Sequence, residues 1–264
     1  MFFAVLLALT ALPVFTETDA AATMEIVFFG EKAEDAILLT LDGTNILIDA
    51  GLNKTGKEIA AYLEERGIGR IDLMLITHFD KDHVGGADKV LESAEIGRIV
   101  CPDYPGENKQ YEQFVKAAEE CGIGPETLCA DTDIGFGPLA LHIDVPEQNY
   151  EDENDMSLVT TVQYGDCALL FAGDAESPRL AELLEDGVDM CGFLKVPHHG
   201  RIEKLSPQFI QAVRPKLAVI TCSEAEPEDE LLVQLLRDAG AEVRLTREGA
   251  VRVYCDGKDI RFGE

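Results

Sequence analysis

The stretch IDLMLITHFDKDHVGG, residues 71–86, decides how the rest of the chain is interpreted. Its first seven residues form a short apolar run, which is typical of a buried strand. The run stops at His78, and residues 78–83 then follow the pattern H-x-D-x-D-H, with two glycines shortly afterwards. A tight loop of this kind lets imidazoles and carboxylates from one backbone segment converge on two adjacent metal ions. The mixture of nitrogen and oxygen ligands suits Zn, Mn or Fe.

Two later strands are expected to end in the same way. ALLFAGD (168–174) places Asp174 directly after a buried strand, and FLKVPHHG (193–200) places His198 and His199 after another. Taken alone, an Asp after Gly is more often a turn former, and a His-His-Gly more often an exposed turn. Strand ends meet along one edge of a packed sheet, however, so together with the first motif they predict a single site.

Strands and helices alternate through two similar halves of the chain. The strands are expected at 24–30, 36–51 (a hairpin turning at Asp42-Gly43), 71–77, 98–101, 139–145, 157–174 (a second hairpin), 193–196, 216–222 and within 242–262. The helices are expected at 54–66, 87–93, 111–120, 178–186 and 228–239. Two such halves suit an α/β fold, a four-layer αββα sandwich. No linker interrupts the sequence after the leader, so residues 23–264 are expected to form one domain.

The chain is strongly acidic, with 50 Asp and Glu residues against 22 Lys and Arg, a formal net charge of −28. A surface of this sign repels phosphate backbones and anionic membranes at long range, so binding to bulk duplex DNA is disfavoured. The few basic residues near the motifs can grip only one or two phosphates. They are Lys81, Lys195, Arg201 and Lys204. The hydrophobic content of 46% is ample for a sizeable core and excludes a disordered chain.

Residues 1–15 carry no charged side chain, and Ala20-Ala21-Ala22 follows this apolar run. The pattern is typical of a secretory signal peptide or an uncleaved N-terminal anchor over residues 1–22. It predicts a secreted or extracytoplasmic protein. The run is shorter than the roughly 20 residues that a spanning helix needs, and no transmembrane domain is expected beyond it.

The cysteines and the fifth histidine lie outside these motifs. The seven cysteines form no C-x-x-C pattern, so zinc-finger and thioredoxin-like functions have no support. Cys121 and Cys129 are a candidate disulfide in an exported protein, and the sequence does not decide whether they pair. His142 stands alone within an expected strand and is not predicted to join the site.

The motifs H-x-D-x-D-H, F-A-G-D and L-K-V-P-H-H-G, in this order, resemble the metallo-β-lactamase superfamily. They are most similar to the branch that holds the extracytoplasmic domain of ComEC-type DNA-uptake proteins and the phosphorylcholine esterases. The resemblance covers about residues 24–262, including the closing TREGAV at 246–251.

The resemblance also implies a ligand set for two divalent ions, Zn or alternatively Mn. The implied ligands are His78, Asp80, Asp82, His83, Asp174 and a histidine of the pair His198-His199. His78 and Asp80 would hold one ion. Asp82, His83 and the late histidine would hold the other, and Asp174 would bridge them. The superfamily often has its late ligand as P-x-H, which matches 197–199 and favours His199 over His198. His198 would then face the substrate.

The chain departs from the superfamily's pattern in three places. Most members have histidine at the position of Asp80, and a further histidine ligand where residues 154–159 read NDMSLV. The first ion is therefore expected to be more open, which argues against β-lactam hydrolysis. Arg201 replaces the serine usual in this branch, and the acidic SEAEPEDE at 223–230 replaces a polar stretch. These last two departures leave the substrate open.

The predicted function is an exported hydrolase of phosphodiester bonds that uses two metal ions. Ions about 3.5–4 Å apart lower the pKa of a bridging water, which makes a metal-bridging hydroxide available near neutral pH. The expected catalytic residues are Asp82, Asp174 and His198, the last as a proton donor to the leaving oxygen or a binder of developing charge. Lys195 and Arg201 flank the histidine pair, and each is expected to hold a phosphate or to be a solvated surface charge.

Three alternatives remain open at this stage. The same site can serve an ester or lactone hydrolase or a nuclease associated with DNA uptake, and the fold can also serve a non-catalytic binding module. Intact ligand types at all three strand ends weigh against the module. The net charge weighs against long DNA and favours a small or polymeric anionic phosphodiester. The sequence does not determine the oligomeric state.

Overall fold

The structure is a computed structural model in which residues 22–263 are described. The leader predicted over residues 1–22 lies outside the described residues, apart from Ala22. No helix between residues 22 and 263 is long and apolar enough to cross a membrane.

The elements follow one another along the chain as short strands and helices. The strands of the first sheet are β1 (Met24–Phe28), β2 (Ala36–Leu41), β3 (Thr44–Ala50), β5 (Leu73–Leu75), β7 (Ile99–Pro102), β8 (Glu126–Leu128), β16 (Val251–Cys255) and β17 (Ile260–Phe262). Those of the second sheet are β9 (Thr132–Phe136), β10 (Leu139–Asp144), β11 (Val159–Tyr164), β12 (Cys167–Phe171), β13 (Phe193–Lys195), β14 (Leu217–Ile220) and β15 (Glu242–Leu245). A separate small pair consists of β4 (Arg70–Ile71) and β6 (Glu95–Ile96). The α-helices are α1 (Asn53–Arg66), α2 (Lys81–Val84), α3 (Ala87–Leu91), α4 (Lys109–Glu120), α5 (Ser177–Asp186), α6 (Ser206–Val213) and α7 (Glu230–Asp238), and three 3₁₀ turns are η1 (Asn154–Met156), η2 (His198–Gly200) and η3 (Thr246–Glu248).

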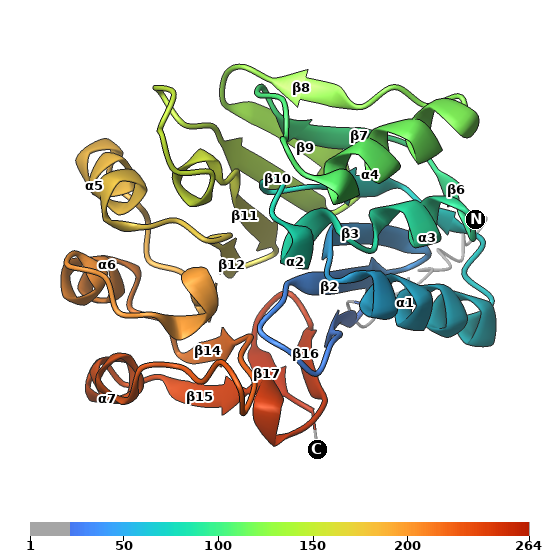
Figure 1. Cartoon of the computed structure of the whole chain (residues 1–264). Helices are drawn as coiled ribbons and strands as arrows, with labels where there is room; N and C mark the ends of the chain where they lie inside the picture. The colour runs from blue at the N-terminus through green and yellow to red at the C-terminus, as the bar shows by residue number, and fades with distance from the viewer. Residues whose placement is uncertain (1–21, 264) are drawn as a thin grey trace, which may run out of the picture.

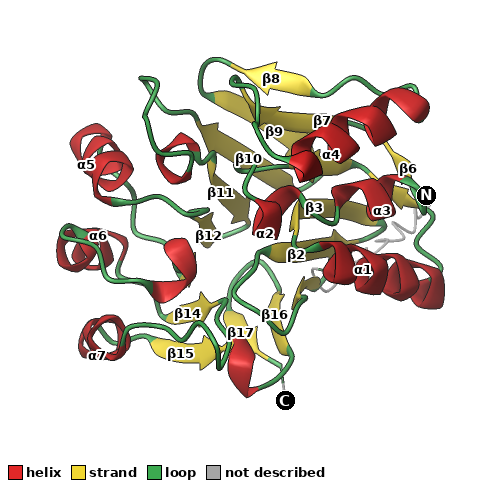
Figure 2. Ribbon diagram, in the orientation of Figure 1, coloured by secondary structure: helices red, strands yellow, loops and turns green. Residues whose placement is uncertain are grey.

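Two mixed sheets stack face to face in the middle of the molecule. Their strand orders are β17-β16-β1-β2-β3-β5-β7-β8 and β15-β14-β13-β12-β11-β10-β9. Helices α1, α3 and α4 cover the outer face of the first sheet, and α5, α6 and α7 that of the second (Figure 1). Figure 2 shows the same order of layers, with yellow strands enclosed between red helices. The predicted four-layer αββα sandwich is confirmed.

The central strands are continuously apolar because both faces of each sheet are covered there. In β2, Ile37 points toward the second sheet and Leu38 toward the helices. In β12, Leu169 points toward the first sheet and Leu170 toward α5 and α6. This alternation produces three apolar cores, one between the sheets and one beneath each helical layer.

Most predicted elements are present near their expected bounds. Asp42 and Gly43 both adopt positive φ (48° and 84°), as a tight two-residue hairpin turn requires. The strand expected at 71–77 is divided into β4 and β5, because Ile71 pairs with β6 whereas Leu73–Leu75 pair with β3. The sequence analysis missed β8, β9 and α6. Both strands are short and polar, and α6 is only eight residues long with a proline in its first turn.

Strand direction brings the three motifs to one edge of the sandwich. In the first sheet β3, β5 and β7 run parallel, and in the second β12, β13, β14 and β15 do so. Parallel strands end at a common edge, where α/β proteins place their sites. The motif after β5, the aspartate after β12 and the histidines after β13 therefore lie together.

Candidate metal centre

The motif of residues 78–83 leaves β5 and turns at once into α2. His78 and His83 are fully buried, whereas the side chains of Asp82 and Asp80 are 24% and 47% exposed. The glycines after the motif make the turn sterically possible. A Cβ on Gly86 would lie 2.2 Å from the carbonyl oxygen of Ala50 at the end of β3.

Three imidazoles and two carboxylates from the three strand ends converge. Asp174 Oδ2 lies 3.1 Å from His199 Nε2 and 3.3 Å from His83 Nε2. Asp82 Oδ2 lies 3.4 Å from His199 Nε2, and the rings of His78 and His83 are 4.0 Å apart. Two groups result in which the ligand atoms all lie within 4.8 Å of one another. They are His78-His83-Asp174 and Asp82-His83-His199.

The Nε2 atoms of His78, His83 and His199 are buried, and none makes a hydrogen bond of acceptable geometry among residues 22–263, although those of His83 and His199 lie 3.1–3.4 Å from carboxylate oxygens. Buried polar atoms without a partner are costly, so they point to a ligand that completes them. Ligand atoms of one tetrahedral zinc ion, each about 2.0–2.2 Å from it, lie about 3.3–3.5 Å apart. The nitrogens and carboxylate oxygens here have nearly that spacing. The donors therefore fit divalent ions such as Zn or Mn.

Asp49 at the end of β3 holds His83 from behind. Its Oδ2 lies 2.8 Å from His83 Nδ1, and it accepts hydrogen bonds from the backbone N (2.8 Å) and hydroxyl (2.7 Å) of Thr77. Histidine ligands of metals commonly have such a carboxylate on the other ring nitrogen, which fixes the ring and its tautomer. The sequence analysis missed Asp49. Its signal was available in LIDAG (47–51), where an aspartate ends a buried strand much as Asp174 does.

The groups nearest to Nδ1 of His78 and His199 are uncharged, although Asp35 Oδ1 lies 3.7 Å from Nδ1 of His199. His78 Nδ1 lies 3.1 Å from the hydroxyl of Thr77 and 3.4 Å from that of Ser157. His199 Nδ1 donates to the carbonyl oxygen of Thr221 at 2.9 Å. All three imidazoles thus have Nδ1 occupied and Nε2 free to bind an ion, which is the arrangement of metal ligands.

The two late histidines have different partners. Both adopt left-handed backbone, with φ of 48° for His198 and 51° for His199, a strain that occurs mostly at functional sites. His199 directs Nε2 to Asp174, whereas His198 Nδ1 lies 3.1 Å from Glu176 Oε1. His198 thus belongs to a separate group with Glu176 and Glu203.

Asp80 lies at the rim of the cluster. Its Oδ2 is 4.0 Å from His78 Nε2, and it joins neither of the two ligand groups. Burial raises the pKa of its carboxyl, to which the negative charge of Asp82 adds. The structure brings Asp80 beside His78 without placing it in the convergent set.

Lys195 is neither the phosphate-binding group nor the solvated charge that was expected. Its side chain is 1% exposed and pairs with Asp35 and Asp174. The expectation was wrong because residues two apart in a strand share a face. Lys195 lies on the same side of β13 as Phe193, inside the sandwich. Arg201, by contrast, is exposed beside the histidine pair.

The charges of the cluster are strongly coupled. Burial alone would raise the pKa of Asp174, but His199, His83 and Lys195 hold it well below its usual range. Burial disfavours charged imidazoles, yet Asp174 raises the pKa of His199 to about 9 and that of His83 well above its usual value. In the metal-free chain the carboxylates thus favour the protonated forms of His83 and His199, and bound divalent ions would take the place of those protons.

His142 and the two cysteines of the candidate disulfide lie outside the cluster. His142 is half-exposed in β10, where its Nδ1 meets Asp133 at 2.8 Å. Cys121 and Cys129, the candidate disulfide, are both free thiols in the structure, with contacts to Leu91 and Asp103 respectively.

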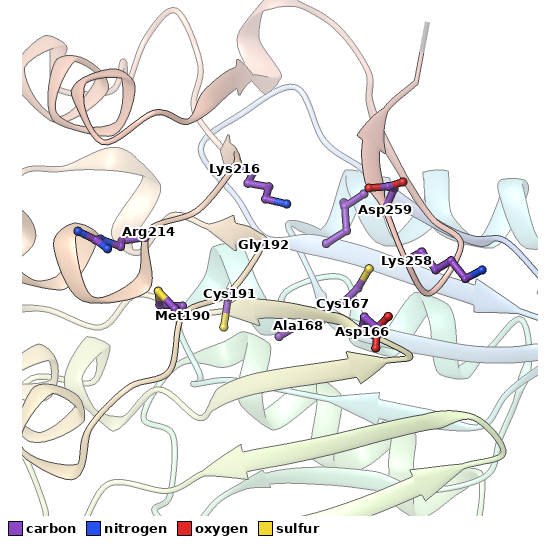
Figure 3. Close-up of a pocket in the computed structure, with 11 residues that line it drawn as sticks. Asp166, Cys167, Ala168, Met190, Cys191, Gly192, Arg214, Lys216, Lys258 and Asp259 are labelled. Carbon is purple, nitrogen blue, oxygen red and sulfur yellow. The ribbon is translucent and has the colours of Figure 1, made fainter.

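A cavity of about 310 Å³ lies at the opposite, amino ends of β12, β13 and β14. Its lining includes two buried thiols and three basic side chains, Arg214, Lys216 and Lys258. In Figure 3 the charged ends of Arg214 and Lys258 point away from the centre of this cavity, and that of Lys216 points toward it. Because these cations do not converge on one ligand, the cavity is a weaker candidate site than the cluster at the carboxyl ends of the strands.

The fold and the buried cluster define a class of protein, the metal-dependent hydrolases built on an αββα sandwich. The chain belongs to the Metallo-beta-lactamase superfamily, whose sequence pattern matches residues 30–223.

Individual proteins also resemble this chain in sequence and in fold. ComE operon protein 3 of Bacillus subtilis is 27% identical over 202 residues, covering 74% of this chain and 26% of that protein. Recombination protein 2 of Haemophilus influenzae is 26% identical over 197 residues, covering 73% and 23%. The chain thus spans about a quarter of the length of these relatives. The metallo-beta-lactamase fold protein YhfI from Bacillus subtilis superposes with a TM-score of 0.62 at 12% identity, covering 91% of this chain and 100% of that one. The predicted resemblance to the superfamily and its ComEC-like branch is confirmed.

Proposed function

We propose that the chain is a two-metal hydrolase of phosphodiester bonds. The observation that carries the proposal is the convergence of three buried imidazole nitrogens with two carboxylates. When bound, two divalent ions would supply Lewis-acid activation of a water molecule and of a phosphoryl oxygen. The chain's own side chains hold those ions and prepare the substrate.

The ligands divide between two positions. His78 would hold one ion together with Asp80, whose Oδ2 lies 4.0 Å from His78 Nε2. Asp82, His83 and His199 would hold the other, and Asp174 would be shared. The position beside His78 has fewer protein ligands and leaves more room for water or substrate, as an open catalytic metal site requires.

His198 is proposed to act on the substrate and to leave metal binding to His199. Glu176 accepts a hydrogen bond from Asn154 Nδ2 at 2.9 Å, and its Oε1 lies 3.1 Å from His198 Nδ1. An imidazole held in this way beside the metal ligands can give a proton to the leaving oxygen or bind the charge that develops there.

The proposed substrate is a small or polymeric phosphodiester, and long DNA is the second candidate. The net charge of −28 opposes polyanions, and Lys195, one of the four basic residues near the motifs, is buried and already paired. The remaining Lys81, Arg201 and Lys204 are too few for the many phosphate contacts of a nuclease. Similarity to ComE operon protein 3 is what keeps the DNA-uptake nuclease as the alternative.

Metal analysis coupled to a substrate screen tests this proposal. The purified protein would be reconstituted with Zn or Mn, analysed for bound metal, and assayed on bis(p-nitrophenyl) phosphate, p-nitrophenyl phosphate, a thioester, a lactone, a lactam and long DNA. We expect two ions per chain, hydrolysis of the activated phosphodiester, and weak, salt-sensitive activity on DNA. Binding of fewer than about one equivalent would contradict the metal centre. Rapid, metal-dependent degradation of long DNA at physiological salt would restore the nuclease.

Export is proposed from the leader pattern of residues 1–22. Fractionation of cells that express the full chain tests it, because the protein should be found outside the cytoplasm. Recovery in the cytoplasm alone would contradict export and leave the catalytic proposal intact.

A further inference from the structure

Lys195 is a fully buried cation directly behind the candidate metal centre. It is the last residue of β13, and its residue exposure is 0%. Its Nζ donates to the carbonyl oxygen of Gly173 at 3.0 Å, lies 3.5 Å from Asp174 Oδ1, and pairs closely with Asp35 Oδ2. A lysine is almost never buried in this way unless carboxylates pair with it.

The two oxygens of Asp174 consequently have different surroundings. Oδ1 faces the ammonium group of Lys195, whereas Oδ2 faces the Nε2 atoms of His83 and His199 at 3.3 and 3.1 Å. A carboxylate held on one oxygen presents the other in a defined direction. Lys195 therefore helps to fix which oxygen of Asp174 faces the imidazoles.

Asp35 extends the same contact chain to the late histidine. Its Oδ1 accepts a hydrogen bond from the hydroxyl of Thr221 at 2.6 Å, and that hydroxyl lies 3.1 Å from His199 Nδ1. Asp35, like Lys195, is buried, at 1% exposure. Asp174, Lys195, Asp35, Thr221 and His199 thus form one continuous chain of contacts behind the cluster.

We propose that Lys195 is a positioning residue, an internal counter-ion that sets the orientation of Asp174 and, through Asp35 and Thr221, that of His199. It lets three buried carboxylates, those of Asp35, Asp49 and Asp174, coexist at the end of an apolar core. It also works from the side of the cluster away from the histidine Nε2 atoms, so it does not compete with substrate. The inference rests on the proposed metal centre and adds a residue that does not itself bind metal.

Metal affinity tests the inference, with Lys195→Met as the main variant and Lys195→Arg as the conservative one. Affinities for Zn and Mn would be measured with a competing chelator, and the absorption spectrum of the Co(II)-loaded protein would report ligand geometry. We expect Lys195→Met to weaken metal binding about 10–100-fold, as loss of a group that orients a ligand usually does, and to shift the Co(II) spectrum. Lys195→Arg should recover part of both. Lys216→Met, at the exposed amino end of β14, is the matched control and should change neither.

Lys195→Met leaves two buried carboxylates without their counter-ion and can prevent folding. The double variant Lys195→Met with Asp35→Asn removes one carboxylate together with the ammonium group, and it decides the matter if the single variant does not fold. A folded single or double variant with unchanged affinity and an unchanged Co(II) spectrum would overturn the positioning role alone. If the unaltered protein binds no ion, the proposed metal centre is wrong and this inference falls with it.

Discussion

The two halves of the candidate metal centre are held by different kinds of group. His83 Nδ1 lies 2.8 Å from Oδ2 of the buried carboxylate of Asp49. Both oxygens of that carboxylate also accept hydrogen bonds from Thr77. His78 is backed only by the hydroxyls of Thr77 and Ser157, at 3.1 and 3.4 Å. A carboxylate raises the basicity of the imidazole that it contacts more than a hydroxyl does.

The half around His83 also has more ligands. Asp82 and His199 lie on that side, whereas His78 has only the rim residue Asp80 beside it, 4.0 Å away. The comparison teaches that the two ions should differ in affinity, the ion beside His83 binding more tightly. The position beside His78 would then hold its ion more loosely.

The largest effect is expected where the two halves meet. Asp174→Asn keeps the size of the side chain but removes the charge that both groups share, so it should abolish activity and most metal binding. Metal analysis after reconstitution and gel filtration measures this directly. A variant that retained two ions would show that Asp174 is not the shared ligand.

The next largest effect separates the two late histidines. His199→Ala should lose the ion beside His83, because its Nε2 faces Asp82 and Asp174. His198→Ala should keep both ions and lose about 10²–10⁴-fold in rate, the usual contribution of a positioned proton donor. Metal content and kcat, measured on both variants, check the assignment. Loss of metal from His198→Ala, with retention in His199→Ala, would exchange the two roles.

Removing the groups behind the imidazoles tests the comparison itself. Asp49→Asn should weaken the tighter ion about 10–100-fold. Ser157→Ala should have a smaller effect, confined to the weaker ion, because its contact to His78 is long and uncharged. Stepwise titration with a chelator resolves the two affinities. If both variants weakened the same ion equally, the two halves would not be distinct.

A smaller effect is expected at the segment after β14, which packs beside His199. There Arg247 forms two hydrogen bonds of 2.8 Å to Glu228 and holds the pKa of that carboxyl at about 2, below its ordinary 4.5. The folded pKa is depressed, so the unfolded chain binds the extra proton. This stabilisation is therefore present above about pH 4.5 and is lost as the pH falls toward 2.

Glu228→Gln should accordingly lower the free energy of unfolding by about 1.5–3 kcal/mol at pH 7, as loss of a charged hydrogen bond does. The difference from the unaltered protein should shrink at pH 3. Urea unfolding of both metal-free proteins at the two pH values measures it. A difference that stayed constant with pH would contradict the linkage.

The smallest effect is expected outside both halves. His142→Ala replaces a half-exposed residue whose partner, Asp133, is also on the surface. The free energy of unfolding should change by no more than about 0.5 kcal/mol, and kcat by no more than about twofold. The same metal analysis and kinetic assay apply. A defect comparable to that of Asp174→Asn would mean that the ligand set is wrong.

The sequence predicted the sandwich well because strands buried on both faces are continuous apolar runs that can be recognised without distant contacts. β8 and β9 were not predicted, because edge strands exposed to solvent contain no such apolar run. The roles of Asp35 and Asp49 were not predicted for another reason. Asp49 ends a buried strand, which is a visible signal, but its pairing with His83, like that of Asp35 with Lys195, depends on a partner that only folding brings near.

By itself the sequence determined which residue types end the buried strands, and so which side chains are available to bind metal. That information is local, since an apolar run followed by His or Asp needs no other part of the chain. Only the tertiary structure decided that Lys195 is an internal cation, that Asp49 backs His83, and that the two late histidines have different partners. Those outcomes depend on stacking two sheets, as the hydrogen bond between Thr221 and Asp35, 186 residues apart in sequence, illustrates.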